Sequence, residues 1–254
     1  MKIALLIIFS LLLLINTGYA IAYEPIPITY SHDLEEIIFD GKWSTWNEWK
    51  RSTLTSIEYE NGGEIQLRTA HLGDFIYVFV DATKDTTLDY NEDRAIICFD
   101  SHNDKNPISD SNDYCFMTSL KGKRSFTFQG GSFLALNGNF KTIPNPDGYI
   151  GISSVSGSDD RYSKIPHGDY EFRIPIELLG RNNIYGFYFS YYDFHTGKSY
   201  SWPEDVILER SFQIPSPSEW GEIYSPDKSL PELEWPILTF LPAIALIIYL
   251  SRFQ

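Results

Sequence analysis

Residues 98–115 carry the side chains of this chain that are best suited to bind a cation. The segment reads CFDSHNDKNPISDSNDYC, with four Asp and three Asn between the only two Cys residues. Calcium takes about six to eight oxygen ligands, which carboxylates and amides supply. We therefore predict a structural calcium site in this loop; the alternative is a solvated polar turn, because Asp and Asn also favour turns. The predicted ligands are Asp100, Asn103, Asp104, Asp110 and Asp113.

A second acidic segment, residues 89–100, leads into this loop. It reads DYNEDRAIICFD and begins with the spacing D-x-N-x-D at Asp89, Asn91 and Asp93. Arg94 occupies the position where an EF-hand needs Gly, so the segment is not an EF-hand. Its oxygen ligands form a second candidate cation site or share the first. Hard oxygen ligands without clustered His or thiolate favour calcium over zinc.

The two Cys residues bracket the acidic loop, and the elements on either side must position it. The flanking runs RAIICFD and DYCFMTSL are short, apolar and rich in β-branched or aromatic residues, so both are predicted to be strands. Joined by the loop they form a hairpin with Cys98 close to opposite Cys115. In an exported protein this pair is predicted to be a disulfide, worth about 3 kcal/mol in the chain-entropy model. The alternative is two buried free thiols.

The two ends of the chain predict export and anchoring. Residues 1–22 have one Lys, a long apolar run and small residues near Ala22, the layout of a secretory signal peptide; the alternative is an uncleaved anchor. Residues 235–251 are almost uncharged and precede Arg252, which predicts a transmembrane helix after a linker at 226–234. We expect the intervening domain to lie outside the cell, anchored at its surface, or secreted if the tail is removed.

The charge balance fits an extracellular domain. The chain has 34 Asp and Glu residues against 20 Lys and Arg residues, a formal net charge of −14. A surface of this sign repels nucleic acid and anionic lipid headgroups, so we predict no nucleic-acid partner. It suits an extracellular domain that is soluble, binds cations, or both.

Residues 23–225 are predicted to form a single antiparallel β-sandwich of about eight to ten strands, of the jelly-roll or immunoglobulin-like kind. Strand-like runs alternate with turn residues such as ENGG, QGGS and NPDG at intervals of about ten residues. Residues 43–52 and 174–180 each favour a turn or two of helix. The predicted strands are 35–39, 63–72, 74–82, 94–100, 113–120, 125–129, 148–155, 169–176 and 184–194.

Several motifs, in order along the chain, resemble the family 9 carbohydrate-binding modules and the related DOMON-like sandwiches. The motifs are IIFDGKWSTWNEWKRS, HLGDFIYVFVDATKDT, EDRAIICFD, YEFRIPIELL, FSYYDFHTGKSYSWP and PSEWGEI. They run from about residue 37 to residue 223, which is nearly the whole exported part. The resemblance implies a β-sandwich that often carries structural calcium. The same fold hosts sugar binders, haem binders and adaptors, so function must be argued from the site.

For a glycan ligand, such as a cell-envelope polysaccharide, the resemblance implies aromatic side chains that stack on sugar rings and polar groups that bind hydroxyls. Trp202, in a Tyr-Ser-Trp-Pro segment after a Gly-containing turn, is the predicted stacking platform. Tyr192, Asp193 and Arg161 are the predicted accompanying residues. No clear second Trp completes the paired sugar clamp of the family.

Other functions are weighed against glycan binding. A haem-binding branch of the fold uses an axial Met, but Met117 lies mid-strand and is predicted to be in the core, as are Trp49 and Trp220. No G-x-S-x-G, H-E-x-x-H or P-loop pattern occurs, so we predict a protein that binds rather than catalyses. The main alternative is an envelope or surface-layer structural module that contacts other proteins through a flat apolar patch.

Overall fold

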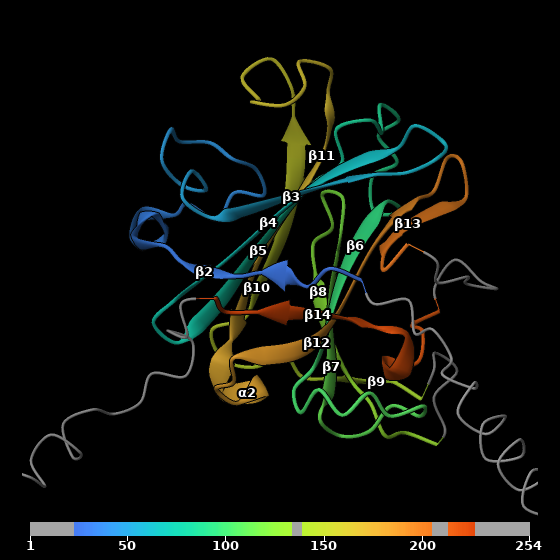
Figure 1. Cartoon of the computed structure of the whole chain (residues 1–254). Coiled ribbons are helices and arrows are strands. Elements are labelled where there is room, and N and C mark those ends of the chain that lie inside the picture. The colour runs from blue at the N-terminus through green and yellow to red at the C-terminus, as the bar shows by residue number, and fades with distance from the viewer. Residues whose placement is uncertain (1–22, 134–138, 205–212, 227–254) are drawn as a thin grey trace, which may run out of the picture.

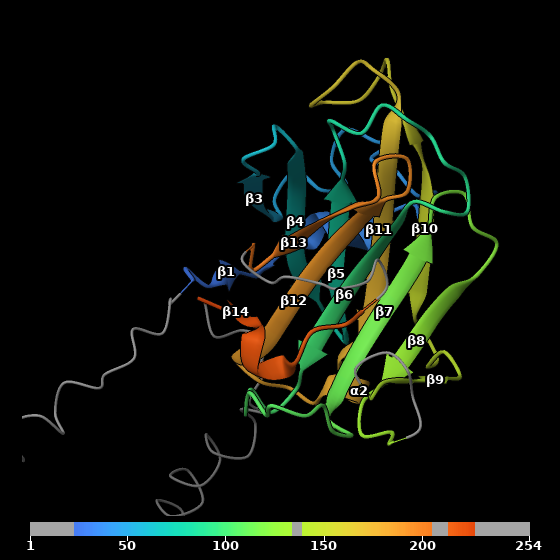
Figure 2. The same ribbon diagram turned by 90° about the vertical axis from the view of Figure 1, so that its right-hand side faces the viewer.

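The computed structural model describes residues 23–133, 139–204 and 213–226. In these ranges the chain forms two β-sheets that pack face to face, with few and short helices (Figures 1 and 2). This confirms the predicted all-β sandwich. The predicted signal peptide (1–22), the membrane helix (235–251) and all but the first residue of the linker lie outside the described residues. Within the described ranges, no helix is long and apolar enough to cross a membrane.

The larger sheet has eight strands in the order β1-β14-β12-β6-β7-β8-β9, with β13 also paired to β12. Its pairs are antiparallel except for β1 with β14. Its strands are β1 (Ile26–Pro27), β6 (Arg94–Asp100), β7 (Asp113–Ser119), β8 (Ser125–Gln129), β9 (Lys141–Ile143), β12 (Ile184–Asp193), β13 (Lys198–Trp202) and β14 (Gly221–Tyr224). In Figure 2 this sheet lies in front of the other.

The smaller sheet has six strands in the order β10-β11-β5-β4-β2, with β3 also paired to β4. Its strands are β2 (Thr29–Tyr30), β3 (Thr53–Glu58), β4 (Glu64–Leu72), β5 (Phe75–Asp81), β10 (Ile150–Ser156) and β11 (His167–Pro175). The short helices of the described residues are η1 (His32–Glu36), α2 (Ile176–Leu179) and η2 (Pro217–Glu219).

Eight of the nine predicted strand runs are strands, and the departures have local causes. Residues 35–36 end the 3-10 helix η1 and residues 37–39 are irregular, so the run 35–39 is not a strand; residues 43–52 form turns without a helix. Residues 174–180 contain α2, as predicted. The predicted total of eight to ten strands is wrong, because the described residues contain fourteen. Two of the additional strands, β1 and β2, are edge strands of two residues each, too few to show an alternating pattern.

The space between the sheets is filled by the side chains that alternation assigns to the inner faces. On β5, the side chains of Ile76, Val78 and Val80 are fully buried in this core. On β12, Phe187 and Phe189 belong to the same cluster. Burial of apolar surface supplies about 25 cal/mol per Å², so this layer is the main source of stability.

The outer face of the smaller sheet is also covered. The odd-numbered side chains of β5, including Phe79, pack beneath segment 31–52. Trp49 stacks on Phe79 with ring centroids 5.4 Å apart, and its Nε1 donates a hydrogen bond to Glu171 Oε1 over 3.1 Å. Burial raises the pKa of Glu171 to about 8. The prediction that Trp49 is a core residue is confirmed.

The outer face of the larger sheet carries its own apolar cluster. Cys98 and Cys115 are directly opposite each other in the register of β6 and β7, and they form the predicted disulfide. Met117 is buried in this cluster, as predicted. Trp220 is buried there too, and its Nε1 donates to Pro215 O over 3.1 Å. The buried residues of the cluster are Cys98, Cys115, Met117, Phe128, Phe140, Tyr188, Ile214 and Trp220.

Candidate functional site

The strands bring two sets of loops to opposite ends of the sandwich. The upper end in Figure 1 carries loops 82–93, 157–166 and 194–197, together with segment 40–52. The lower end carries the acidic loop 101–112 between β6 and β7. The chemistry of the two ends can therefore be considered separately.

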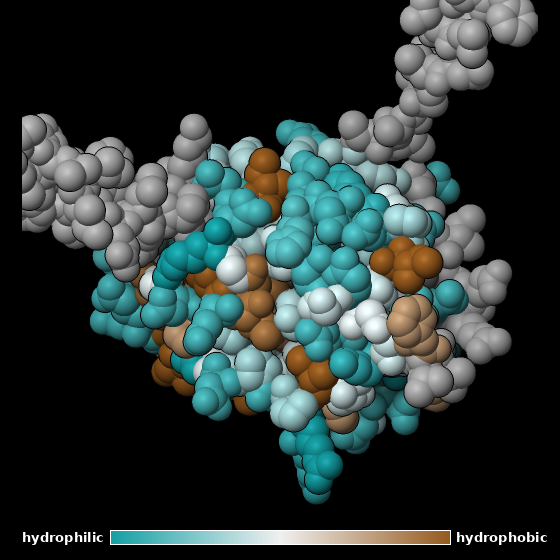
Figure 3. Space-filling model, turned by 90° about the horizontal axis from the view of Figure 1, so that it is seen from below, coloured by the Kyte–Doolittle hydropathy of each residue, from teal (hydrophilic) through white to brown (hydrophobic). Residues whose placement is uncertain are grey.

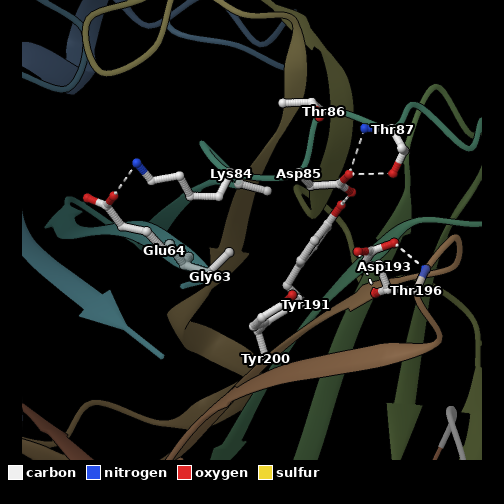
Figure 4. Close-up of a pocket in the computed structure, with 12 residues that line it drawn as sticks. Gly63, Glu64, Lys84, Asp85, Thr86, Thr87, Tyr191, Asp193, Thr196 and Tyr200 are labelled. Carbon is white, nitrogen blue, oxygen red and sulfur yellow. Dashed lines mark hydrogen bonds and ion pairs between the residues drawn. The ribbon is translucent and has the colours of Figure 1, made fainter. Parts of the chain in front are cut away.

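A pocket of about 180 Å³ lies at the upper end, where the two sheets separate (Figure 4). The smaller sheet contributes the ends of β4 and β5, and the larger sheet contributes β12, β13 and the turn between them. The volume is below the ~300 Å³ typical of drug-sized ligand sites, so the pocket suits one small polar unit. Its lining residues are Gly63, Glu64, Ile65, Ala82, Lys84, Asp85, Thr86, Thr87, Tyr191, Asp193, Thr196 and Tyr200.

Two carboxylates of this pocket are held in fixed orientations. Thr87 donates to Asp85 Oδ1 through its backbone N (2.9 Å) and its Oγ1 (2.8 Å), and Tyr191 OH donates to Asp85 Oδ2. Thr196 donates to Asp193 through its backbone N (3.1 Å) and its Oγ1 (2.6 Å). Burial raises the pKa of Tyr191, which keeps the phenol protonated as the donor. Figure 4 shows both carboxylates beside the Tyr191 ring.

Asp93 joins the same two carboxylates. One oxygen from each of Asp85, Asp93 and Asp193 lies within 4.8 Å of the others, a spacing that could hold a cation. Burial raises the pKa of Asp93 to about 6. Backbone N–H groups of Asp89 and Phe194 donate to Asp93 over 2.8 and 3.0 Å. The segment predicted as a second cation site therefore contributes Asp93 to this group of three carboxylates. Asp89 takes part only through its backbone N–H, which donates to Asp93.

The aromatic wall of the pocket depends on a glycine. Tyr200 stacks on Tyr191 with centroids 6.3 Å apart and meets Tyr59 edge-on at 5.0 Å. A Cβ at Gly63 would lie 2.3 Å from the Tyr200 ring, so only glycine leaves room for it. Tyr200 is half-buried and shows part of its ring to the pocket.

A second pocket of about 220 Å³ adjoins the first and shares Glu64, Lys84 and Thr86 with it. Lys84 Nζ lies 3.3 Å from Glu64 Oε2, so the two pockets share this ion pair. The far wall of the second pocket comes from loop 157–166. Its lining residues are Glu64, Gln66, Thr83, Lys84, Thr86, Tyr162, Ser163 and Ile165.

The same loop contacts an exposed tryptophan. Trp46 is 70% exposed, whereas Trp43 and Trp49 on either side of it in the sequence are buried. The Arg161 guanidinium lies 3.9 Å from the Trp43 ring centroid and 4.6 Å from the Trp46 centroid, and Arg161 Nη2 donates to Trp46 O over 2.6 Å. Trp46 was not predicted as a site residue, because Trp43, Trp46 and Trp49 recur at intervals of three and the sequence does not indicate which of them faces solvent.

The prediction that Trp202 is an exposed platform is wrong. Trp202 is the last residue of β13 and is only 9% exposed, with its ring 5.9 Å from that of Phe187 in the core. A Cβ at Gly221 would lie 2.3 Å from the indole, so the absence of a side chain there makes the space that the ring fills. The segment that looked like a loop instead continues a strand, and its Trp faces inward.

The other three predicted binding residues lie in different places. Asp193 lines the first pocket, and Arg161 contacts Trp46 and Trp43. Tyr192 alternates away from the pocket, and its ring lies 4.7 Å from the Arg94 guanidinium. The predicted set is therefore not one site, although Asp193 and Arg161 both belong to the upper end.

The acidic loop at the lower end does not bring its carboxylates together around one point. Among the described residues, no three carboxylate or imidazole ligand atoms of this loop lie within 4.8 Å of one another. Each Asp instead accepts backbone N–H groups of the loop, the pattern of capped turns. Asp100 accepts from His102 N (3.1 Å) and Lys105 N (2.9 Å). Asp104 accepts from Asn106 N (3.3 Å), and Asp110 accepts from Asn112 N (2.8 Å). Asp113 accepts from Asp110 N (2.7 Å).

The loop keeps some oxygen atoms without a hydrogen-bond partner. These are Oδ1 of Asp113, Asn103 and Asn112. Burial raises the pKa of Asp113 to about 7, and neighbouring carboxylates add to the shift. Asn103 is tied by its Nδ2 to Glu222 Oε1 over 3.1 Å. The loop therefore resembles the polar-turn alternative more than a formed calcium cage.

No family model matches the chain, and no curated protein sequence is significantly similar to it. Solved structures do match. One is a carbohydrate-binding module of family 9 from Caldicellulosiruptor kristjanssonii in complex with cellotriose, at a TM-score of 0.51 and 13% identity over 80% of this chain and 93% of that chain. This chain has the CBM9 fold. A CBM9 from the same organism in complex with glucose matches at a TM-score of 0.44 and 12% identity, over 80% of this chain and 95% of that one.

The CBM9 fold confirms the resemblance found in the sequence motifs. At 13% identity the likeness concerns the fold, so the binding residues have to be argued from this chain. The exposed side chains at the upper end, above all Trp46, are therefore the candidates for ligand binding.

Proposed function

We propose that this chain is a non-catalytic glycan-binding protein whose stacking platform is Trp46. The observation that carries the proposal is the 70% exposure of the Trp46 ring at the loop end of a CBM9-like sandwich. An exposed indole offers a flat apolar surface with a polar edge, which matches the C–H face and the hydroxyls of a pyranose ring. The CBM9 module that is similar in structure was solved with cellotriose, which makes cellotriose the first ligand to test.

Arg161 is the polar partner of the platform. Its guanidinium is fixed against the Trp43 ring and bonded to Trp46 O, so little conformational freedom remains to be lost on binding. Arginine carries five N–H donors, and those not used by Trp46 O can donate to sugar hydroxyls. A ligand stacked on Trp46 would therefore receive hydrogen bonds from a preorganised group.

The second pocket extends this surface. Tyr162 follows Arg161 directly in the chain and lines that pocket, and its OH accepts hydrogen bonds from Arg68 Nε over 2.8 Å and from Arg68 Nη2. Lys84 and Glu64 offer a donor and an acceptor further along. We infer that a short oligosaccharide would stack one ring on Trp46 and direct its hydroxyls toward these groups.

The test is calorimetric titration of cellotriose, preceded by a glycan array, on the purified protein. Trp46→Ala should weaken binding by about 2 kcal/mol, roughly 30-fold, the size expected for an aromatic hot spot. The unfolding temperature should not change, because the ring is exposed. Ile108→Ala, an equally exposed apolar residue at the lower end, is the matched control and should bind as wild type. An array without any bound glycan, or an unchanged affinity in Trp46→Ala, would refute the proposal.

We further propose that residues 235–251 anchor the protein at the cell surface after removal of residues 1–22. The support is the uncharged run that ends before Arg252 and the signal-like amino terminus. The full chain should sediment with membranes, and a chain that ends at residue 234 should be secreted. Recovery of both in the soluble fraction, with the tail still present, would exclude anchoring.

The envelope-module alternative requires a flat apolar contact surface. The lower face of the molecule is mostly hydrophilic, with hydrophobic residues in small separate groups (Figure 3). Dispersed apolar residues of this kind are normal on a soluble domain. The visible lower face therefore gives no support to a protein–protein interface of the predicted type.

A further inference from the structure

A cluster of ionisable side chains lies inside the upper end of the smaller sheet, away from the acidic loop. Asp81 ends β5, His167 and Asp169 begin β11, and Asp160 comes from loop 157–166. Asp81 and Asp169 are directly opposite each other in the β5–β11 register. All four side chains are buried, and three of them have no exposed surface.

The three carboxylates gather around one imidazole nitrogen. His167 Nε2 lies 2.9 Å from Asp81 Oδ1, 3.6 Å from Asp169 Oδ1 and 3.7 Å from Asp160 Oδ1. His167 Nδ1 lies 2.6 Å from Ile165 O. A carbonyl oxygen can only accept, so Nδ1 carries a hydrogen and donates it. This tautomer leaves the Nε2 lone pair of a neutral imidazole directed at the carboxylates.

Some oxygen atoms of the three carboxylates accept hydrogen bonds from neighbouring groups, and others do not. Asp160 Oδ1 accepts the backbone N–H groups of Tyr162 (2.7 Å) and Ser163 (2.8 Å). Asp169 Oδ2 accepts a hydrogen bond from Ser156 Oγ. In the part of the chain that the structure describes, Asp81 Oδ2 and Asp169 Oδ1 have no hydrogen-bond donor, and Asp81 Oδ1 and His167 Nε2 contact each other over 2.9 Å as an ion pair.

The buried carboxylates of this site outnumber the imidazole that they face. Three buried carboxylates face a single imidazole, which can supply at most one positive charge. Buried charges are costly unless they are paired or coordinate a metal. A divalent cation would compensate two of the negative charges and would use the oxygens of Asp81 and Asp169 and the nitrogen of His167 that lack donors, together with an oxygen of Asp160.

We propose that Asp81, Asp160 and His167 bind a divalent transition-metal ion, with Asp169 Oδ1 at the fourth position. One oxygen from each of the two Asp residues and one His167 nitrogen lie within 4.8 Å of one another. A tetrahedral ion with bonds of about 2.0–2.2 Å needs ligand atoms about 3.3–3.6 Å apart. Asp169 Oδ1 and Asp160 Oδ1 lie 3.6 and 3.7 Å from Nε2, whereas Asp81 Oδ1, at 2.9 Å, would have to move away from Nε2 by about 0.5 Å to bind the ion.

The ligand types select the class of ion. Calcium and magnesium prefer all-oxygen sites, whereas an imidazole nitrogen with carboxylates suits zinc and its neighbours. A metal-bound histidine typically donates its other ring N–H to a backbone carbonyl, which His167 Nδ1 does with Ile165 O. Zinc is therefore the first ion to test, and its role in a closed site of this kind is structural.

The experiment uses the full chain, unfolded in urea with its disulfide intact and refolded with EDTA or with ZnCl₂, because a buried site fills most readily during folding. Elemental analysis after desalting should find one zinc per chain in the zinc-refolded protein, and its unfolding temperature should exceed that of the EDTA sample. Refolding with MnCl₂ and CaCl₂ gives the comparison, and calcium should be retained least.

The variant His167→Gln should retain at least tenfold less zinc, whereas His102→Gln, an exposed histidine at the other end of the molecule, should retain it fully. Refolding with CoCl₂ provides a readout that needs no variant, because tetrahedral nitrogen and oxygen ligation of Co²⁺ gives visible absorption bands. Wild-type protein that refolds with less than about a tenth of an equivalent of any of these metals and shows no Co²⁺ bands would overturn the proposal. Full zinc retention in a folded His167→Gln variant would do so as well.

Discussion

The two acidic regions of this molecule hold their carboxylates in opposite ways. In loop 101–112 the Asp side chains bend back and accept the backbone N–H groups of their own turns. In the cluster around His167 the carboxylates come from two strands and the loop before β11, and among the described residues no backbone N–H donates to the Asp81 side chain. A dense run of Asp in the sequence thus marks turns, whereas a cation site needs carboxylates that the fold brings together without donors.

The largest expected difference between the two regions is in the effect of removing a histidine. His167→Ala removes the imidazole that faces three buried carboxylates, and breaking a buried ion pair in this way costs about 3–5 kcal/mol. His102→Ala in the acidic loop should change the free energy of unfolding by less than about 0.5 kcal/mol, since its side chain is exposed. Urea unfolding of both variants measures the contrast, and equal effects would remove the distinction between the regions.

The next effect concerns the covalent bond that flanks the acidic loop. Replacing both Cys98 and Cys115 by Ala should lower the free energy of unfolding by about 3 kcal/mol, because the disulfide limits the unfolded state. Reduction of the wild-type protein should produce the same loss. The zinc content of the refolded double variant should not change, since the two regions lie at opposite ends. A linked loss of zinc would show that the two regions depend on each other.

A smaller effect is expected from the turn caps themselves. Asp104→Ala and Asp110→Ala each remove one acceptor of a backbone N–H at the protein surface, so each should cost at most about 1 kcal/mol. Asn at the same positions keeps an acceptor oxygen and should restore most of the stability. A loss well above 1 kcal/mol in either Ala variant would indicate that these carboxylates do more than cap turns.

The smallest effect is expected from calcium. Because the carboxylates of loop 101–112 do not surround one point, any change in unfolding temperature between calcium and EDTA should be the same, within about 1 °C, in the wild-type protein and in Asp104→Ala. A rise of several degrees with calcium that is absent in Asp104→Ala and Asp110→Ala would instead reinstate the calcium site predicted from the sequence, with Asp113 Oδ1 and Asn103 Oδ1 as its free ligands.

Much of the scaffold could be predicted from the sequence, because its determinants are local. The alternating apolar residues of β5 predicted a strand with two distinct faces. The structure packs one face into the core between the sheets and the other face beneath segment 31–52. Cys98 and Cys115 could be paired because the two strands are joined by one loop, which places them opposite each other in a hairpin. The number of strands was underestimated, in part because the two-residue edge strands β1 and β2 contain no periodic signal.

The candidate sites could be predicted only in part, because their members come together through the packing of distant segments. Asp193 and Arg161 were found from the sequence, but Trp46 was not, since Trp43 and Trp49 share its local pattern and are buried. Trp202 could not be assigned to the core without knowing that Gly221 on β14 would leave space for its ring.

The sequence by itself thus determined the strand runs, the disulfide hairpin and the inward faces, each of which depends on neighbours within a few residues or across one turn. The tertiary structure alone decided which Trp faces solvent and which carboxylates meet. Asp81 and His167 are 86 positions apart in the sequence, yet the pairing of β5 with β11 places Nε2 and Oδ1 2.9 Å apart. Nothing in the local pattern around either residue encodes that register, which follows from how the whole sandwich closes over its core.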